Sequence, residues 1–264
     1  MNLLLRNIGF IAALFFLEIY TVTCYAKDAR EIMEESELRT RADNFYSEYR
    51  VEVFDQDKMI SAKHLTRMDK KTMNGRFTLL RFTHPFSIKG SSFLVENTEA
   101  SDSNIWSYMP STKLLRKISG SQKQNWFMGT DFTYEDFEYN KTNFYIFELV
   151  TRDQNLEEKS EIVIDAYPAR NNHVKSSGYS KKRYFLDNET LYAKVVEYYD
   201  SDLRLCRRLV SENLKVIDGI VISGKQTMYN YKQNSKTVIT SSKTQINKEI
   251  SDSYFTPKYL RNQD

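Results

Sequence analysis

The residues best equipped for chemistry gather in an acidic and aromatic segment, residues 131–139. Four carboxylates lie in it, separated by Phe, Tyr and Thr: Asp131, Glu135, Asp136 and Glu138. Carboxylates in such number can serve acid–base catalysis or bind a calcium ion, although their spacing matches no common calcium-binding loop. The alternative is structural, with the acids capping a turn or pairing with Lys and Arg while the aromatic rings pack. We expect the structural role and keep the catalytic or metal-binding role as the alternative.

Other catalytic and metal-binding patterns are absent from the sequence. The three histidines, His64, His84 and His173, stand in no metal-binding spacing, and no G-x-S-x-G motif occurs. A partial P-loop begins at Gly219, but Gln226 replaces the Ser or Thr that holds magnesium, and the intervening Ile-Val-Ile is typical of a strand. We therefore expect no enzymatic activity, no catalytic residue, no metal ion and no cofactor.

The N-terminus has the pattern of an export signal. Arg6 precedes an apolar run over residues 8–17, which Glu18 ends. The run is shorter than the about 20 residues that a membrane-spanning helix needs, and it fits the core of a signal peptide. Small residues at the −3 and −1 positions predict cleavage after Ala26, so residues 1–26 are the predicted signal peptide.

Two other fates of this segment remain as alternatives. In a lipoprotein, Cys24 would be acylated and kept, but Thr21 and Thr23 stand where such signals carry Leu and a small residue. An uncleaved anchor would need residues 19–24 to extend the apolar run, with Glu18 neutralised.

The composition after residue 26 predicts one domain, residues 27–264, with a substantial core. The net charge of +3 is too small for the basic surface that nucleic-acid binding needs. Cleavage leaves Cys206 as the single cysteine, so no internal disulfide can form. The 18 Tyr and 16 Phe supply much of the apolar surface, while Gly and Pro are scarce.

Hydrophobic periodicity predicts one helix followed by many strands. The helix spans residues 28–42, with Asp28 as its cap and an apolar face formed by Ala29, Ile32, Met33, Leu38 and Ala42. Period-two alternation then predicts about a dozen strands, at residues 49–53, 76–82, 92–96, 104–109, 144–150, 161–167, 183–186, 191–199, 203–210, 216–222, 227–231 and 237–246. So many short strands with few helices favour a mainly β (α+β) fold built on a large antiparallel, strongly curved sheet or incomplete barrel.

Four motifs in the middle of the chain are too specific to follow from composition. The first three read His84-Pro85-Phe86-Ser87-Ile88-Lys89-Gly90-Ser91-Ser92-Phe93-Leu94, Ile105-Trp106-Ser107-Tyr108-Met109-Pro110 and Arg116-Lys117-Ile118-Ser119-Gly120-Ser121. The fourth is Phe127-Met128-Gly129-Thr130-Asp131-Phe132-Thr133-Tyr134-Glu135-Asp136. Together they resemble the LolA-like family of bacterial outer-membrane lipoprotein-sorting proteins, in the little-characterised branch with the signature FMG[ST]DFTYED. Ser107 and Met109 depart from the bulkier residues of that family's pattern.

The resemblance implies an unclosed half β-barrel of the LolA/LolB/RseB type, with an N-terminal helix and short covering helices, located in the periplasm. It implies a chaperone-like carrier of a lipid or acylated ligand between membranes. The expected partners are lipid or lipoprotein acyl chains, membranes in peripheral contact and an inner-membrane transporter, but no nucleic acid. The alternative is a non-carrying interaction protein, either an accessory subunit of an inner-membrane exporter or an envelope-stress sensor.

Six side chains near the motifs are the predicted lining of a hydrophobic trough: Phe93, Val95, Trp106, Tyr108, Phe127 and Phe132. Phe93 and Val95 are two residues apart, as are Trp106 and Tyr108, so each pair shares one face of its strand. Alternation does not say which face is concave, and the alternative is that all six form an ordinary dry core.

The predicted export signal gives a first test. The mature protein should begin at Lys27, without added acyl groups, because the apolar run is too short to act as an anchor. The intact mass of the periplasmic form measures this directly. A mass that begins at Cys24 with added acyl chains would instead establish the lipoprotein alternative.

Overall fold

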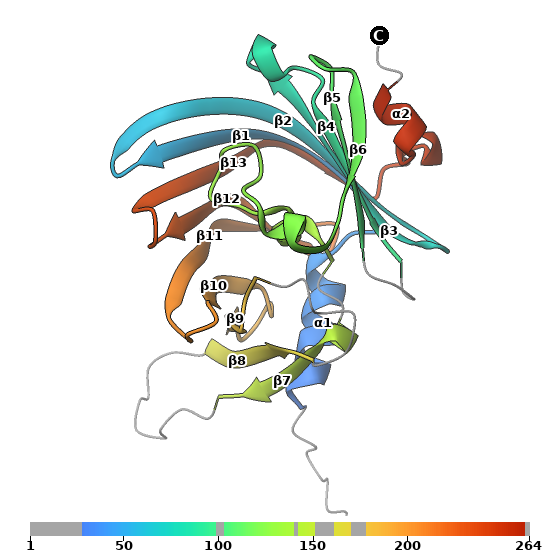
Figure 1. Cartoon of the computed structure of the whole chain (residues 1–264). Coiled ribbons are helices and arrows are strands. Elements are labelled where there is room, and N and C mark those ends of the chain that lie inside the picture. The colour runs from blue at the N-terminus through green and yellow to red at the C-terminus, as the bar shows by residue number, and fades with distance from the viewer. Residues whose placement is uncertain (1–27, 99–102, 140–141, 151–160, 170–177, 262–264) are drawn as a thin grey trace, which may run out of the picture.

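One antiparallel sheet of thirteen strands makes up most of the chain that the structure describes (Figure 1). The structure is a computed structural model, and it describes residues 28–98, 103–139, 142–150, 161–169 and 178–261. The predicted signal peptide and His173 lie outside these residues. In the described part, neither α-helix is long and apolar enough to cross a membrane.

The strands and helices have the following bounds. The first half of the sheet consists of β1 (Asn44–Asp55), β2 (Lys58–Thr72), β3 (Gly75–His84), β4 (Ser92–Asn97), β5 (Asn104–Met109) and β6 (Leu114–Ile118). The second half consists of β7 (Tyr145–Leu149), β8 (Glu161–Pro168), β9 (Lys181–Asp187), β10 (Ala193–Tyr199), β11 (Leu205–Ile217), β12 (Ile220–Asn230) and β13 (Ser235–Ile246). The helices are α1 (Ala29–Thr40), α2 (Pro257–Arg261) and the short 3-10 helices η1 (Phe86–Ile88), η2 (Gly120–Gln124), η3 (Tyr134–Phe137), η4 (Thr142–Phe144) and η5 (Asp252–Tyr254).

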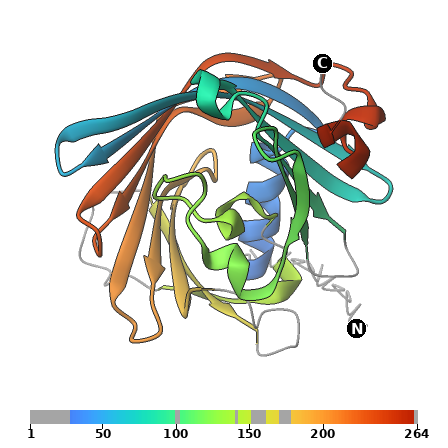
Figure 2. The same cartoon turned by 45° about the horizontal axis from the view of Figure 1, so that its top comes forward.

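The chain builds the sheet outward from its centre and then back again. The strand order is β6-β5-β4-β3-β2-β1-β13-β12-β11-β10-β9-β8-β7, so the first strand pairs with the last and β6 and β7 form the two edges. Figure 2 shows the sheet curled into an open half-barrel with α1 and the green segment after β6 on its concave side. The predicted fold class is therefore confirmed.

Two strands and one turn differ from the sequence prediction. Strand β2 was not predicted because Lys, Arg and Asp interrupt its apolar alternation, and β6 is short and equally basic. The predicted strand at residues 216–222 is in fact interrupted by a hairpin turn, in which Asp218 and Gly219 have positive φ and join the end of β11 to the start of β12. The P-loop-like residues after Gly219 lie in β12, as their β-forming side chains indicate.

Helix α1 lies inside the half-barrel and presents a partly polar face to it. Asp28 caps the helix and forms a capping box with Glu31, in which each side chain accepts a hydrogen bond from the other residue's backbone. Ile32 and Met33 are buried as predicted, whereas the prediction for Leu38 was wrong, since it is 75% exposed. The inner position one turn after Ile32 belongs to Ser36, whose hydroxyl donates to the Leu191 carbonyl at 2.7 Å.

The segment that joins β6 to β7 crosses the concave side of the sheet and contains the signature motif, residues 127–136. We call this part of the chain the signature segment. Gly129 has a φ of +69°, which favours glycine, and it follows Met128, which is also left-handed. The Thr130 hydroxyl donates to the Phe127 carbonyl and accepts from the Phe132 amide. A serine hydroxyl can make the same two bonds, which explains why Thr can replace Ser in the signature.

A buried carboxylate fastens this segment to the centre of the sheet. Asp131 accepts hydrogen bonds from Asn230 Nδ2 at 3.1 Å, Thr237 Oγ1 at 2.7 Å and Ser235 Oγ. The Arg207 guanidinium donates to the Asp131 carbonyl at 2.6 Å, and it also forms an ion pair with Asp136 at 2.8 Å. All of these partners belong to β11, β12 and β13.

The remaining acids of the segment also have basic partners. Lys182 lies 3.8 Å from Glu135, and Lys123 lies 2.5 Å from Glu138. Within the described residues, no group of three or more His, Cys, Asp or Glu is arranged to hold a metal ion. These contacts support the structural interpretation of the four carboxylates.

The role of Asp131 can be tested by substitution. Asp131→Asn places an amide donor against groups that donate to the carboxylate, so we expect the melting temperature to fall by about 5 °C. Thermal denaturation followed by circular dichroism measures the effect, with Glu148→Gln on the exposed side of β7 as the control. Unchanged stability together with loss of calcium binding would favour the metal-binding alternative.

Candidate functional site

A cavity of about 340 Å³ lies between α1, the concave face of the sheet and the signature segment. Its size is within the range of about 300–1,000 Å³ that small-molecule sites occupy. One wall is apolar, formed largely by inner-facing residues of the central strands: Val51, Leu65, Leu80, Phe82, Leu209 and Ile239. Phe127 and Phe132 of the signature segment complete this wall.

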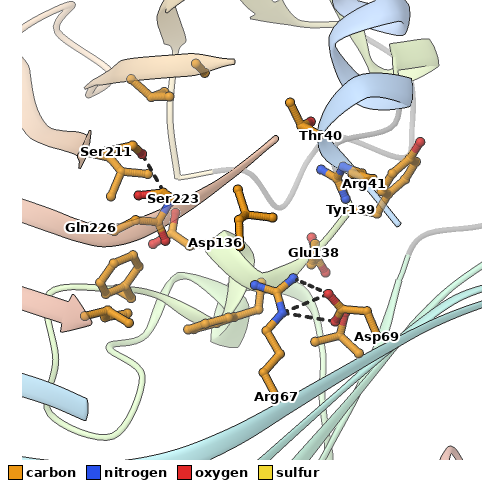
Figure 3. Close-up of a pocket in the computed structure, with 18 of the residues that line it drawn as sticks. Thr40, Arg41, Arg67, Asp69, Asp136, Glu138, Tyr139, Ser211, Ser223 and Gln226 are labelled. Carbon is orange, nitrogen blue, oxygen red and sulfur yellow. Dashed lines mark hydrogen bonds and ion pairs between the residues drawn. The ribbon is translucent and has the colours of Figure 1, made fainter. Parts of the chain in front are cut away.

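An ion pair on β2 points into the cavity. Arg67 and Asp69 occupy alternate positions of the strand, so both side chains face inward (Figure 3). Arg67 Nε donates to both Asp69 oxygens, at 3.1 and 3.0 Å. Burial on its own lowers the pKa of Arg67, but the Asp69 carboxylate raises it above the ordinary value on balance. Arg67 therefore stays charged beside its partner.

A second charged group lies where α1 ends. Tyr139 lies between two guanidinium groups, with Arg41 at 4.3 Å and Arg76 at 5.8 Å from its ring centre. Its hydroxyl donates to Glu37 Oε2 at 2.6 Å. Burial and the neighbouring Glu37 raise the pKa of Tyr139 to about 12, and burial raises the pKa of Glu37. Figure 3 shows Arg41 and Tyr139 beside the end of α1.

A polar but uncharged part of the lining adjoins the apolar wall, since Gln226 pairs with Ile239 on one side and with Ser211 on the other. Ser211, Ser223 and Gln226 on β11 and β12 line it, and Gln226 Nε2 donates to Ser211 Oγ at 3.3 Å (Figure 3). The cavity thus combines an apolar wall, a neutral polar wall and a charged end. Such a lining suits a ligand that has both an apolar and a polar part.

The structure separates the six residues predicted to line a trough. Phe127 and Phe132 line the cavity. Phe93 and Val95 share the concave face, as their spacing predicts, but they are buried in the core beside the cavity and do not line it.

Trp106 and Tyr108 require a correction, because they lie on the other face of the sheet. Trp106 pairs with Leu94, and both pack in the outer cluster that α2 covers, together with Phe255 and Leu260. The reason is the register: Leu94 points away from its neighbours Phe93 and Val95, and its cross-strand partner must share its face. A role in ligand binding remains a prediction for Phe93, Val95, Phe127 and Phe132.

The charged cavity residues were missed by sequence reasoning. Arg67 and Asp69 lie on β2, the strand whose charged residues hid its alternation, and Arg41 follows the helix directly. The signal that could have revealed them is a pair of opposite charges at positions i and i+2 of a strand, because that spacing places both side chains on one face. Asp69 is only 9% exposed, although Asp is a residue type that is seldom buried without a partner.

Breaking the buried pair gives a test of the cavity wall. Asp69→Ala should lower the free energy of unfolding by about 2 kcal/mol, because it leaves the Arg67 charge without its partner; partial exposure of Arg67 keeps the cost below that of a fully buried pair. Urea denaturation measures the change. The double variant Arg67→Met, Asp69→Leu removes both charges and should recover most of the loss. Equal stability of Asp69→Ala and the parent protein would show that solvent fully screens Arg67.

Comparison with known proteins supports the fold and identifies the family. The sequence model of a family described as uncharacterized proteins matches residues 74–262. No curated protein sequence matches the chain.

Three solved structures share the fold along almost the whole described chain. A domain from Vibrio parahaemolyticus named for outer membrane lipoprotein sorting has a TM-score of 0.80 at 22% identity, covering 89% of this chain and 98% of that one. A DUF1329 family protein from Desulfovibrio piger has a TM-score of 0.80 at 24% identity, with coverages of 88% and 97%. A LolA superfamily protein from Nitrosomonas europaea has a TM-score of 0.70 at 20% identity, with coverages of 89% and 100%.

The family match covers well over half of the chain, and the three structures have the same half-barrel fold. The fold is thus shared with a DUF1329 family protein and with a LolA superfamily protein, as the resemblance of the four motifs predicted, and the chain belongs to the family of uncharacterized proteins whose model matches it.

Proposed function

We propose that this protein carries a lipid or another acylated ligand through the periplasm, with the acyl chain in the cavity beneath α1. The observation that carries the proposal is the cavity of about 340 Å³ on the concave side, with its apolar wall and its polar ends. The name of the similar structure from Vibrio parahaemolyticus supports a role in outer membrane lipoprotein sorting. The predicted signal peptide supports a periplasmic location.

Burial of an acyl chain supplies enough free energy for such a role. Each buried methylene contributes about 0.8 kcal/mol, so a chain of roughly 15 methylenes gains about 12 kcal/mol before the costs of binding. A carrier must also release its ligand. The two sheet edges, β6 and β7, are the ends of the strand order, so the half-barrel can adjust its width without breaking strand pairs.

The polar residues of the lining favour a ligand-binding cavity over an ordinary apolar core. A protein whose concave face served only as its core would gain nothing from the buried Arg67–Asp69 pair, because such pairs are often less stabilising than apolar residues of similar volume. Groups of this kind are better explained by a ligand that is itself partly polar.

Filling the cavity tests the proposal. Ala193 on β10 lines the cavity, and Ala193→Trp should occupy the space that an acyl chain would take. We expect parent protein purified from the periplasm to release lipid on solvent extraction, and its melting temperature to rise by several degrees, roughly 3 °C or more, with added fatty acid. Both effects should be lost in Ala193→Trp.

The matched control is Ala62→Trp, at a position of β2 outside the cavity lining, which should keep both effects. Mass spectrometry of the extract and differential scanning fluorimetry provide the measurements. Parent protein that contains no lipid and responds to no amphiphile would instead favour a protein-interaction role.

A further inference from the structure

Two positive charges share one end of the cavity without a carboxylate partner. Arg41 and Arg76 both line the cavity and face the same ring, that of Tyr139. Arg76 Nη1 donates to the Ala42 carbonyl at 2.7 Å, which fixes the position of its guanidinium group. Across the described residues, no Asp or Glu forms an ion pair with either arginine.

The other charges of the cavity lining are already balanced. Arg67 is paired with Asp69, while Asp136 and Glu138 are paired with Arg207 and Lys123 outside the lining. Glu37 is the remaining acid of the lining near the two arginines, and its carboxylate accepts the Tyr139 hydroxyl. Outside the lining, Asp43 also acts on Arg76, but it forms an ion pair with Lys71. One acid against two cations leaves this end of the cavity positive.

The proximity of the two cations is unfavourable while the cavity holds no anion. Burial lowers the pKa of Arg76, and the positive charge of Arg41 lowers it further. Burial raises the pKa of Glu37, while the charges of Arg41 and Arg76 act on it in the opposite direction. An anion bound between the arginines would offset the repulsion between them, because guanidinium groups bind carboxylates and phosphates through paired hydrogen bonds.

An apolar path leads away from this end along a single strand. Arg76, Thr78, Leu80 and Phe82 occupy alternate positions of β3, and all four line the cavity. Their Cα positions extend over about 20 Å at the usual rise per residue. A ligand with a charged head at Arg76 could therefore lay an extended chain along the inner face of β3.

We propose that Arg41 and Arg76 bind the anionic head group, a carboxylate or a phosphate, of the acyl ligand. This inference rests on the proposed function and makes it more specific: the ligand is an anionic amphiphile and not a neutral lipid. Arg41 and Arg76 select the head, and the β3 face holds the chain.

A series of single-chain amphiphiles tests the inference by isothermal titration calorimetry on the protein from residue 27, stripped of lipid. The probes are dodecanoate, dodecyl phosphate, dodecanol and dodecyltrimethylammonium, with inorganic phosphate and acetate as chain-free anions. We expect the two anionic chains to bind about tenfold or more tightly than dodecanol, and dodecyltrimethylammonium to bind most weakly. The chain-free anions should bind far more weakly than the anionic chains, because they bury no methylenes.

Substitutions assign the preference to the two arginines. Arg41→Gln and the double variant with Arg76→Gln should weaken dodecanoate binding by about tenfold or more and leave dodecanol binding within about twofold. Arg50→Gln removes an exposed arginine on β1 and should change neither. If Arg76→Gln lowers the melting temperature strongly, Arg41→Gln alone provides the test, since no described hydrogen bond from the Arg41 side chain would be lost with it.

The outcomes are distinct. Equal binding of anionic, neutral and cationic chains would overturn the head-group inference and leave the carrier proposal intact. Binding of inorganic phosphate as tightly as dodecyl phosphate would show a simple anion site and also overturn the inference. Failure of every chain to bind would overturn the carrier proposal, and the inference with it.

Discussion

An antiparallel sheet that stops short of closure exposes a concave apolar face, and this constraint governs the rest of the molecule. Thirteen strands curl far enough to define an interior, yet β6 and β7 remain edges. The interior must then be covered by parts of the chain that are not strands. Helix α1 and the signature segment between β6 and β7 do this, and the space they leave is the cavity. The cavity thus exists because α1 and the signature segment cover the concave face incompletely, and no single strand creates it.

The signature segment can cover the interior because buried polar contacts hold it in place. Asp131 receives hydrogen bonds from β12 and from β13, while Arg207 of β11 binds both the Asp131 carbonyl and the Asp136 carboxylate. Arg207 also packs against the rings of Tyr179 and Tyr198, at 4.9 and 5.0 Å. These contacts fix the position of the signature segment on the sheet, because a shifted segment would leave a buried charge without a partner. The most specific part of the sequence is therefore the part that fixes the covering segment.

Charge inside the half-barrel is distributed in two ways. Around the signature segment every acid meets a hydrogen-bond donor or a cation, and Lys182 is enclosed by Glu135 and the rings of Tyr145, Tyr179 and Tyr198. Around the end of α1, Arg41 and Arg76 share the ring of Tyr139, and no carboxylate of the described residues is in ion-pair contact with them. The first arrangement stabilises the fold, since each charge is compensated within the protein. The second leaves a positive potential inside a cavity, where it acts most strongly on a bound anion.

The sequence by itself determined the class of fold, the position of most strands and the family. Alternation located β4 and β5 to within a residue, because their side chains divide cleanly between two faces. It failed for β2, where Arg67, Asp69 and several Lys break the apolar pattern. It also failed for Leu38, since Ser36 took the inner position of α1 through a hydrogen bond to a residue far along the chain.

Tertiary structure alone decided which face became the interior and which side chains line the cavity. Phe93 and Trp106 belong to equally apolar runs, but the curvature of the sheet turned one toward the core and the other toward α2. Likewise, nothing local to Arg41, Arg76 or Tyr139 indicates that they meet, because they come from a helix end, a strand and the crossing segment. Period-two alternation predicts which residues share a face of a strand. It does not predict the direction of sheet curvature or the placement of the covering segments, because both depend on contacts between residues distant in the sequence.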